Sequence, residues 1–145
     1  MTVVIGYGTP DRGDDCAGLL VVRGLRNVAA RCVEVIADGL ELMEAWTGAE
    51  RAIIVDAVVS GAAPGSIHRW NGRDLPRMVI HPVSSHGFGL GEAITLANQL
   101  DLLPRQLEVI GIEAGHFDYG RDISQEVAQA ARGVARELTL ELACT

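Results

Sequence analysis

The chain has 145 residues, 48% of them hydrophobic and 21% charged, which suits one domain with a sizeable core. Its formal net charge of −7 argues against nucleic acid and anionic membranes as partners, because both bind basic surfaces. The three cysteines lack a C-x-x-C spacing, and no apolar run approaches the roughly 18 residues of a membrane span. With no secretory signal pattern at the N-terminus, we expect a soluble cytoplasmic protein with reduced thiols.

Short apolar runs alternate along the chain with segments of helical spacing. Val3-Val4-Ile5 predicts a strand, and the spacing over 15–28 predicts a helix capped by Asp14 or Asp15. The further elements, in chain order, are strand 32–37, helix 40–46, strands 52–55 and 66–70, helix 90–100, strand 107–112 and helix 123–138. This alternation predicts a single α/β domain over residues 1–145, with a mostly parallel, twisted central sheet flanked by helices.

Polar side chains follow the predicted strands, where the sites of open α/β sheets lie. Asp11, Asp14 and Asp15 come after the first strand, Asp38 after the second and Asp56 after the third, and His86 lies in the loop before helix 90–100. Asp56 ends a four-residue apolar run, so its carboxylate should be partly buried and need a partner or a metal. Two carboxylates and one imidazole, with open coordination positions, suit a divalent metal such as zinc or nickel.

Other types of site fit the sequence less well. Gly6-x-Gly8 resembles the start of a dinucleotide-binding turn, but Asp11 stands where the third glycine belongs and the acidic loop would repel a pyrophosphate. Asp38 nevertheless lies where a ribose-binding acid would be, so this function is kept as the weaker alternative. No G-x-S-x-G motif is present, and Cys16 is better explained as a small buried residue than as a nucleophile.

Several motifs together resemble the endopeptidases that mature the large subunit of nickel–iron hydrogenases. The motifs, in chain order, are "VIGYGTPDRGDDCAG", "DG" at Asp38-Gly39, "IIVDAVVSGAAPGSIHRW", "SSHGFGLGEAITLA" and "VIGIEAG", followed by a closing helix. They cover most of the chain in the order typical of that family. The resemblance implies a twisted sheet flanked by helices and an endopeptidase of the aspartic type.

The resemblance also implies a substrate and a set of site residues. The substrate would be a nickel-loaded hydrogenase large-subunit precursor, from which a C-terminal extension is cut. Asp15, Asp56 and His86 would contact the nickel, which the substrate carries, and zinc or cadmium could occupy the same site in vitro. Asp38 and Asp15 would be the catalytic residues. A non-catalytic, nickel-dependent checkpoint or chaperone for the precursor is the main alternative.

The chain differs from the family pattern at a few positions. Thr9 stands where many members carry Asn, and His116 is new relative to the pattern. Asp15 stands where many members carry Glu, which shortens the reach of the carboxylate by about 1.5 Å, one C–C bond. We therefore expect the loop that carries Asp15 to approach the site closely, and Asp14 to face away as a helix cap or loop brace.

Overall fold

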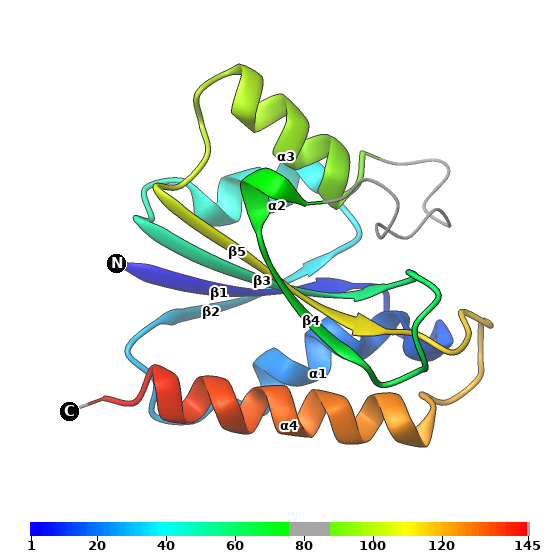
Figure 1. The fold of residues 1–145 in the computed structure, drawn as a ribbon. Coiled ribbons are helices and arrows are strands. Elements are labelled where there is room, and N and C mark those ends of the chain that lie inside the picture. The colour runs from blue at the N-terminus through cyan, green and yellow to red at the C-terminus, as the bar shows by residue number, and fades with distance from the viewer. Residues whose placement is uncertain (76–87, 145) are drawn as a thin grey trace.

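The computed structural model describes residues 1–75 and 88–144, which form one α/β layer structure (Figure 1). The strands are β1 (Thr2–Gly8), β2 (Arg31–Ile36), β3 (Arg51–Val58), β4 (Ile67–Asn71) and β5 (Gln106–Glu113). The α-helices are α1 (Ala17–Arg23), α2 (Gly39–Trp46), α3 (Leu90–Gln99) and α4 (Gln125–Glu141), and two 3₁₀ turns are η1 (Gly13–Cys16) and η2 (Gly72–Asp74). The predicted fold class is confirmed. No helix in these two described ranges is long and apolar enough to cross a membrane.

The five strands form a single sheet in the order β2-β1-β3-β5-β4. The first four strands in this order are parallel, and β4 pairs antiparallel with β5 at the edge. Helices α1 and α4 cover one face of the sheet, and α2 and α3 cover the other (Figure 1). Because both faces are covered, the central strands are apolar on both sides, as the sequence predicted for β1 and β3.

Alternation along the central strands divides the core into two layers. Val4 of β1 and Ile53 of β3 pack with α1 and α4, whereas Ile5 and Ile54 pack with α2 and α3. Tyr7 continues the second set on β1. Asp56 lies two residues after Ile54, so its side chain faces the same layer. The α2/α3 face at the carboxyl ends of the strands is therefore the side on which the acidic residues gather.

The helix predicted over 15–28 is shorter and more irregular than its apolar spacing indicated. It begins with the 3₁₀ turn η1, continues as α1, and ends at Arg23. Leu25 remains buried after the helix has ended, so tertiary packing extends the apolar pattern beyond the helix. Cys16 occupies the N-cap position of α1 and makes no side-chain capping bond, so the prediction that Asp14 or Asp15 caps this helix was wrong.

Candidate functional site

The loop after β1 folds back over the end of its own strand. Thr9 N–H donates to the backbone carbonyl of Asp15 (3.2 Å), and a Cβ atom on Gly8 would lie 2.0 Å from that same carbonyl oxygen. Only glycine at position 8 permits this close approach. The turn thus places Asp15 at the carboxyl edge of the sheet. An aspartate reaches less far than a glutamate would at this position, so the loop has to approach this closely.

Asp15 and Asp56 form a pair of buried acids at this edge. Their exposed fractions are 6% and 5%. The pKa of Asp56 lies well above its ordinary value, because the carboxyl is buried and because the charge of Asp15 is close by. Burial likewise raises the pKa of Asp15, although hydrogen bonds from Thr9 and the positive charge of Arg12 partly oppose it. The distance from Arg12 Nη1 to Asp15 Oδ2 is 4.0 Å.

The Asp56 carboxylate receives little hydrogen bonding for a buried acid. Among the residues that the structure describes, its one donor is the N–H of the next residue, Ala57, at 2.8 Å from Oδ1. Burial without further donors, next to a second acid, favours either a bound proton or a bound cation. The donor set, two carboxylates on one buried edge, fits a divalent metal.

The phenol of Tyr7 also lies at this edge. This residue was not predicted from the sequence as part of the site. The side chain is 6% exposed, and within the described residues its buried hydroxyl has no hydrogen-bond partner. Burial raises the pKa of Tyr7, and the charges of Asp56, Asp15, Asp38 and Glu92 raise it further. Period-two spacing from Val3 and Ile5 could have placed Tyr7 on the same face as the acids.

Asp38 lies at the same edge but has a structural partner set of its own. It is the N-cap of α2, and its Oδ1 accepts hydrogen bonds from Leu40 N–H (3.0 Å) and Glu41 N–H (3.3 Å). Its side chain is exposed. Asp38 therefore stabilises the start of α2, and its catalytic role stays a prediction.

His86, the third predicted metal contact, lies outside the described residues. Within the described part of the chain, no group of three or more His, Cys, Asp or Glu side chains could hold a metal ion. The convergence of Asp15, Asp56 and His86 on one metal thus stays a prediction. The chain re-enters the described part at Phe88, whose carbonyl accepts a hydrogen bond from Gly39 N–H (2.7 Å), beside Asp38.

Asp14, next to Asp15, points away from the acidic pair and binds another loop. Its fully buried carboxylate accepts bonds from Gly115 N–H (2.6 Å), His116 N–H (3.1 Å), Ser124 N–H (2.6 Å) and Ser124 Oγ (2.8 Å). Burial opposes its ionisation, but these bonds outweigh burial and lower the pKa of Asp14. The predicted loop brace is confirmed.

Glu113, at the end of β5, is a fourth buried acid, and it was not predicted from the sequence. Its donors are Ser60 N–H (2.7 Å), Ser60 Oγ (2.6 Å) and the Nε2 atom of His68 (3.1 Å). Burial opposes ionisation, yet the bonds from Ser60 and His68 lower the pKa of Glu113. Serine and histidine both contact one carboxylate oxygen, Oε1, whereas a catalytic triad needs the acid on the opposite ring nitrogen. The cluster is thus an anchor for the β3–β4 connection.

Comparison with known proteins now identifies the family. The sequence model of the family described as "HycI: Hydrogenase maturation protease" matches residues 26–141, most of the chain. The chain belongs to the hydrogenase maturation protease family. The predicted resemblance and the predicted enzyme class, a peptide hydrolase, are both confirmed.

Curated relatives of this maturation protease cover most of its length. Protein FrxA of Pyrococcus furiosus is 30% identical over 121 residues, which is 81% of this chain and 88% of that protein. The hydrogenase 2 maturation protease of Escherichia coli is 26% identical over 116 residues, which is 76% of this chain and 71% of that protein.

The fold matches solved structures as well. The hydrogenase maturating endopeptidase HybD from E. coli superposes with a TM-score of 0.82 at 19% identity, covering 97% of this chain and 91% of that one. The [NiFe] hydrogenase maturation protease HybD from Thermococcus kodakarensis superposes with a TM-score of 0.74 at 23% identity, covering 97% and 98%. At these identities the likeness establishes the fold.

Proposed function

We propose that this maturation protease removes a C-terminal extension from the large-subunit precursor of a nickel–iron hydrogenase, and that nickel already inserted in the precursor is the recognition element. The observation that carries the proposal is the Asp15–Asp56 pair. Two buried carboxylates with raised pKa values, one of them with a single donor among the described residues, favour a bound cation at this edge. A pyrophosphate would add negative charge at this edge, which disfavours the dinucleotide alternative.

In this proposal the metal belongs to the substrate. Asp15, Asp56 and His86 supply three contacts to the nickel, so the isolated protein binds metal weakly, zinc and cadmium included, until the precursor provides further ligands. Nickel held there supplies Lewis-acid chemistry toward the scissile carbonyl or a water. Asp38, exposed at the start of α2, can approach a bound peptide and hold or move a proton, and Asp15 faces the same metal. The free thiols of Cys16, Cys32 and Cys144 suit a cytoplasmic location.

The test is a cleavage assay with two forms of one precursor. Purified protein is mixed with nickel-loaded and nickel-free precursor, and mass spectrometry follows the loss of a C-terminal peptide. We expect loss from the nickel-loaded form alone. Efficient cleavage of the nickel-free form would refute nickel recognition, and binding without any peptide loss would favour the checkpoint alternative.

Two variants and one control sharpen the assay. His86→Ala and Asp56→Asn should each reduce cleavage by at least about 100-fold, because each removes a metal contact. Asp118→Ala removes an exposed acid that pairs with Arg121 instead and should cleave at the normal rate. Normal cleavage by Asp56→Asn would remove the acidic pair from the mechanism.

A further inference from the structure

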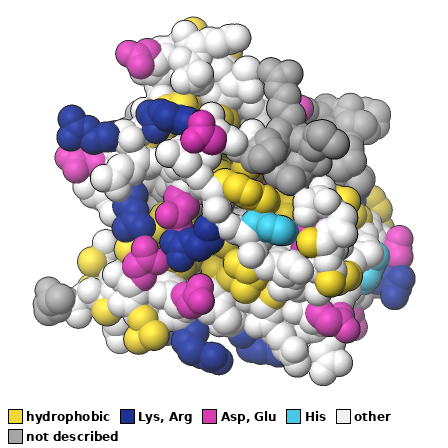
Figure 2. All heavy atoms as spheres, in the orientation of Figure 1, with side chains coloured by type: hydrophobic (Ala, Val, Ile, Leu, Met, Phe, Trp, Pro, Cys, Tyr) yellow, Lys and Arg dark blue, Asp and Glu magenta, His cyan; other side chains and the backbone are white. Residues whose placement is uncertain are grey.

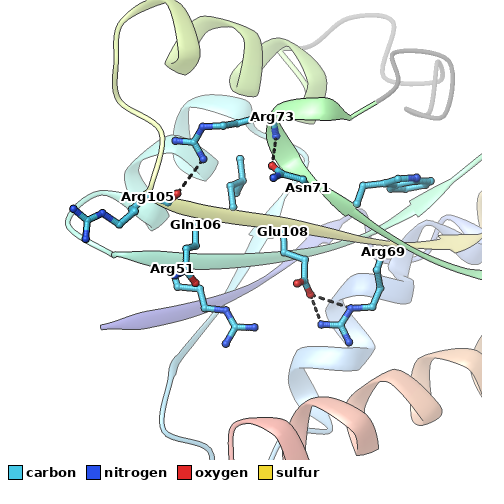
Figure 3. A pocket seen from close by; sticks show the side chains of 9 residues that line it. Arg51, Arg69, Asn71, Arg73, Arg105, Gln106 and Glu108 are labelled. Carbon is cyan, nitrogen blue, oxygen red and sulfur yellow. Dashed lines mark hydrogen bonds and ion pairs between the residues drawn. The ribbon is translucent and has the colours of Figure 1, made fainter.

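A second concave site lies at the opposite edge of the sheet from the acidic pair. It is a cavity of about 380 Å³ where β3 and β5 begin and β4 ends. Four of the chain's arginines line it, together with Trp70 and Glu108: Arg51, Arg69, Arg73 and Arg105 (Figure 3). We call this cavity the arginine pocket. In Figure 2, basic and acidic side chains are interleaved on this side of the molecule.

The pocket carries an excess of positive charge within an acidic protein. Arg69 forms ion pairs with Glu108 and Glu141, and Arg51 pairs with Glu141 at 3.0 Å. Within the described residues, no carboxylate pairs with Arg73 or Arg105. Four guanidinium groups thus face two carboxylates, a local excess of two positive charges in a chain of net charge −7.

Three of these arginines are held in place before any ligand arrives. Arg73 donates to the backbone carbonyls of Pro104 (2.8 Å) and Arg105 (3.2 Å), and its own backbone N–H bonds to Asn71 Oδ1 (3.0 Å). Ion pairs fix Arg51 and Arg69 in the same way, and Figure 3 shows the pair between Arg69 and Glu108. A guanidinium that is already oriented loses little conformational entropy when it binds a carboxylate.

The composition of the arginine pocket decides which kind of anion it suits. Glu108 and Glu141 would repel a doubly charged phosphate more strongly than a single carboxylate. Carboxylates spaced along a peptide can instead reach Arg73 and Arg105 separately, and forked arginine–carboxylate bonds favour that pairing. Trp70 is half-buried and adds apolar surface, and tryptophan and arginine are common at the centres of protein interfaces.

We propose that the arginine pocket is a docking site for an acidic peptide segment of a protein partner. Carboxylates of the segment bind the guanidinium groups of Arg73 and Arg105, and its backbone lies across Trp70. The site is separate from the acidic pair and does not depend on nickel or on cleavage of a precursor.

The proposal is tested by the binding of a labelled hexaglutamate peptide to the intact protein, with fluorescence anisotropy as the readout. A hexaglutamine peptide and inorganic phosphate serve as the comparison ligands. We expect hexaglutamate to bind, hexaglutamine to bind at least about tenfold more weakly, and millimolar phosphate to compete poorly. No binding of hexaglutamate would overturn the proposal. Displacement of bound hexaglutamate by phosphate, added at an equal concentration of negative charge, would also overturn it, because the site would then bind small anions in general.

Two variants with the same change in net charge test whether the peptide binds in the arginine pocket. Arg105→Glu reverses an exposed charge whose side chain makes no bond to any described residue, so the fold should be unaffected, and it should weaken hexaglutamate binding about tenfold. Adding Arg73→Ala should weaken binding further. The control, Arg121→Ala with Arg132→Ala, removes two exposed arginines outside the pocket and should change affinity less than about twofold. An equal loss in the control would mean non-specific attraction and overturn the proposal.

Discussion

Asp56 and Glu113 are two buried acids on neighbouring strands, and their surroundings shift their pKa values in opposite directions. Asp56 pairs in register with Gly111 and Val58 with Glu113, so both carboxylates face the same side of the sheet, two positions apart. Glu113 receives three hydrogen bonds, and its pKa is lowered. Among the described residues Asp56 receives one, from its own neighbour, and it lies near Asp15, and its pKa is raised. Burial alone therefore does not decide the pKa of a carboxyl group, because burial is outweighed by hydrogen-bond donors in Glu113 and reinforced by a neighbouring acid in Asp56.

The same contrast divides two residues that are adjacent in the chain. Asp14 accepts four hydrogen bonds from the loop between β5 and α4, which makes it structural. Asp15 lies close to Asp56, and burial raises its pKa although Thr9 donates hydrogen bonds to its carboxylate. The acids thus divide into Asp14 and Glu113, whose pKa values hydrogen bonds lower, and Asp15 and Asp56, whose pKa values burial raises.

The largest expected effect is the loss of Asp14. Asp14→Ala removes a fully buried carboxylate and leaves the N–H groups of Gly115, His116 and Ser124 without their acceptor, so it should lower the free energy of unfolding by about 3–5 kcal/mol. Urea unfolding at pH 7 measures this change. Asp118→Ala, an exposed acid on the same loop, is the control and should stay within about 0.5 kcal/mol. A loss below about 1 kcal/mol for Asp14→Ala would contradict its role as a brace.

Asp56→Asn should act in the opposite direction. The amide keeps an oxygen for Ala57 N–H and removes a buried charge beside Asp15, so the free energy of unfolding at pH 7 should rise by about 1–3 kcal/mol. Cleavage of the precursor should be lost at the same time. Glu113→Gln is the matched comparison and should destabilise. A destabilised Asp56→Asn protein would show that its carboxylate is as well bonded as that of Glu113.

The two classes of acid should also respond to pH with opposite signs. Folded Asp56 holds its proton more tightly than the unfolded chain does, so its contribution to stability falls as pH rises from about 4 toward its raised folded pKa. The gain from Asp56→Asn should therefore vanish near pH 4 and grow above it. Asp14 has a lowered pKa, so its contribution is complete above about pH 4 and is lost as pH falls through the folded value. Unfolding curves at several pH values check both slopes, and parallel slopes would refute the division.

The smallest effect is expected at Tyr7. Its hydroxyl is buried without a partner among the described residues, so Tyr7→Phe should be neutral or stabilise by about 0.5 kcal/mol. Thermal unfolding measures this difference, with Tyr119→Phe as an exposed control. If Tyr7→Phe instead lowers the free energy of unfolding by more than about 1 kcal/mol, the Tyr7 hydroxyl has a hydrogen-bond partner in the folded protein.

The sequence by itself determined the layer structure and the edge at which the acids gather. Apolar runs such as 52–55, alternating with helical spacing, specify strands and helices through local periodicity, and parallel strands bring the residues that follow them to one edge. Asp15, Asp38 and Asp56 could therefore be predicted at that edge. The helix end at Arg23 could not, because Leu25 stays buried by packing after the helix stops.

Only the tertiary structure decided which acids are bonded and where the arginines converge. The donors to Asp14 lie about a hundred positions along the chain, at Gly115, His116 and Ser124, and Glu113 is bonded by residues from the β3–β4 connection and β4. The arginine pocket likewise joins the starts of β3 and β5 to the end of β4. Hydrogen bonds and charges act over a few ångströms in space regardless of separation in sequence, so local patterns do not specify them.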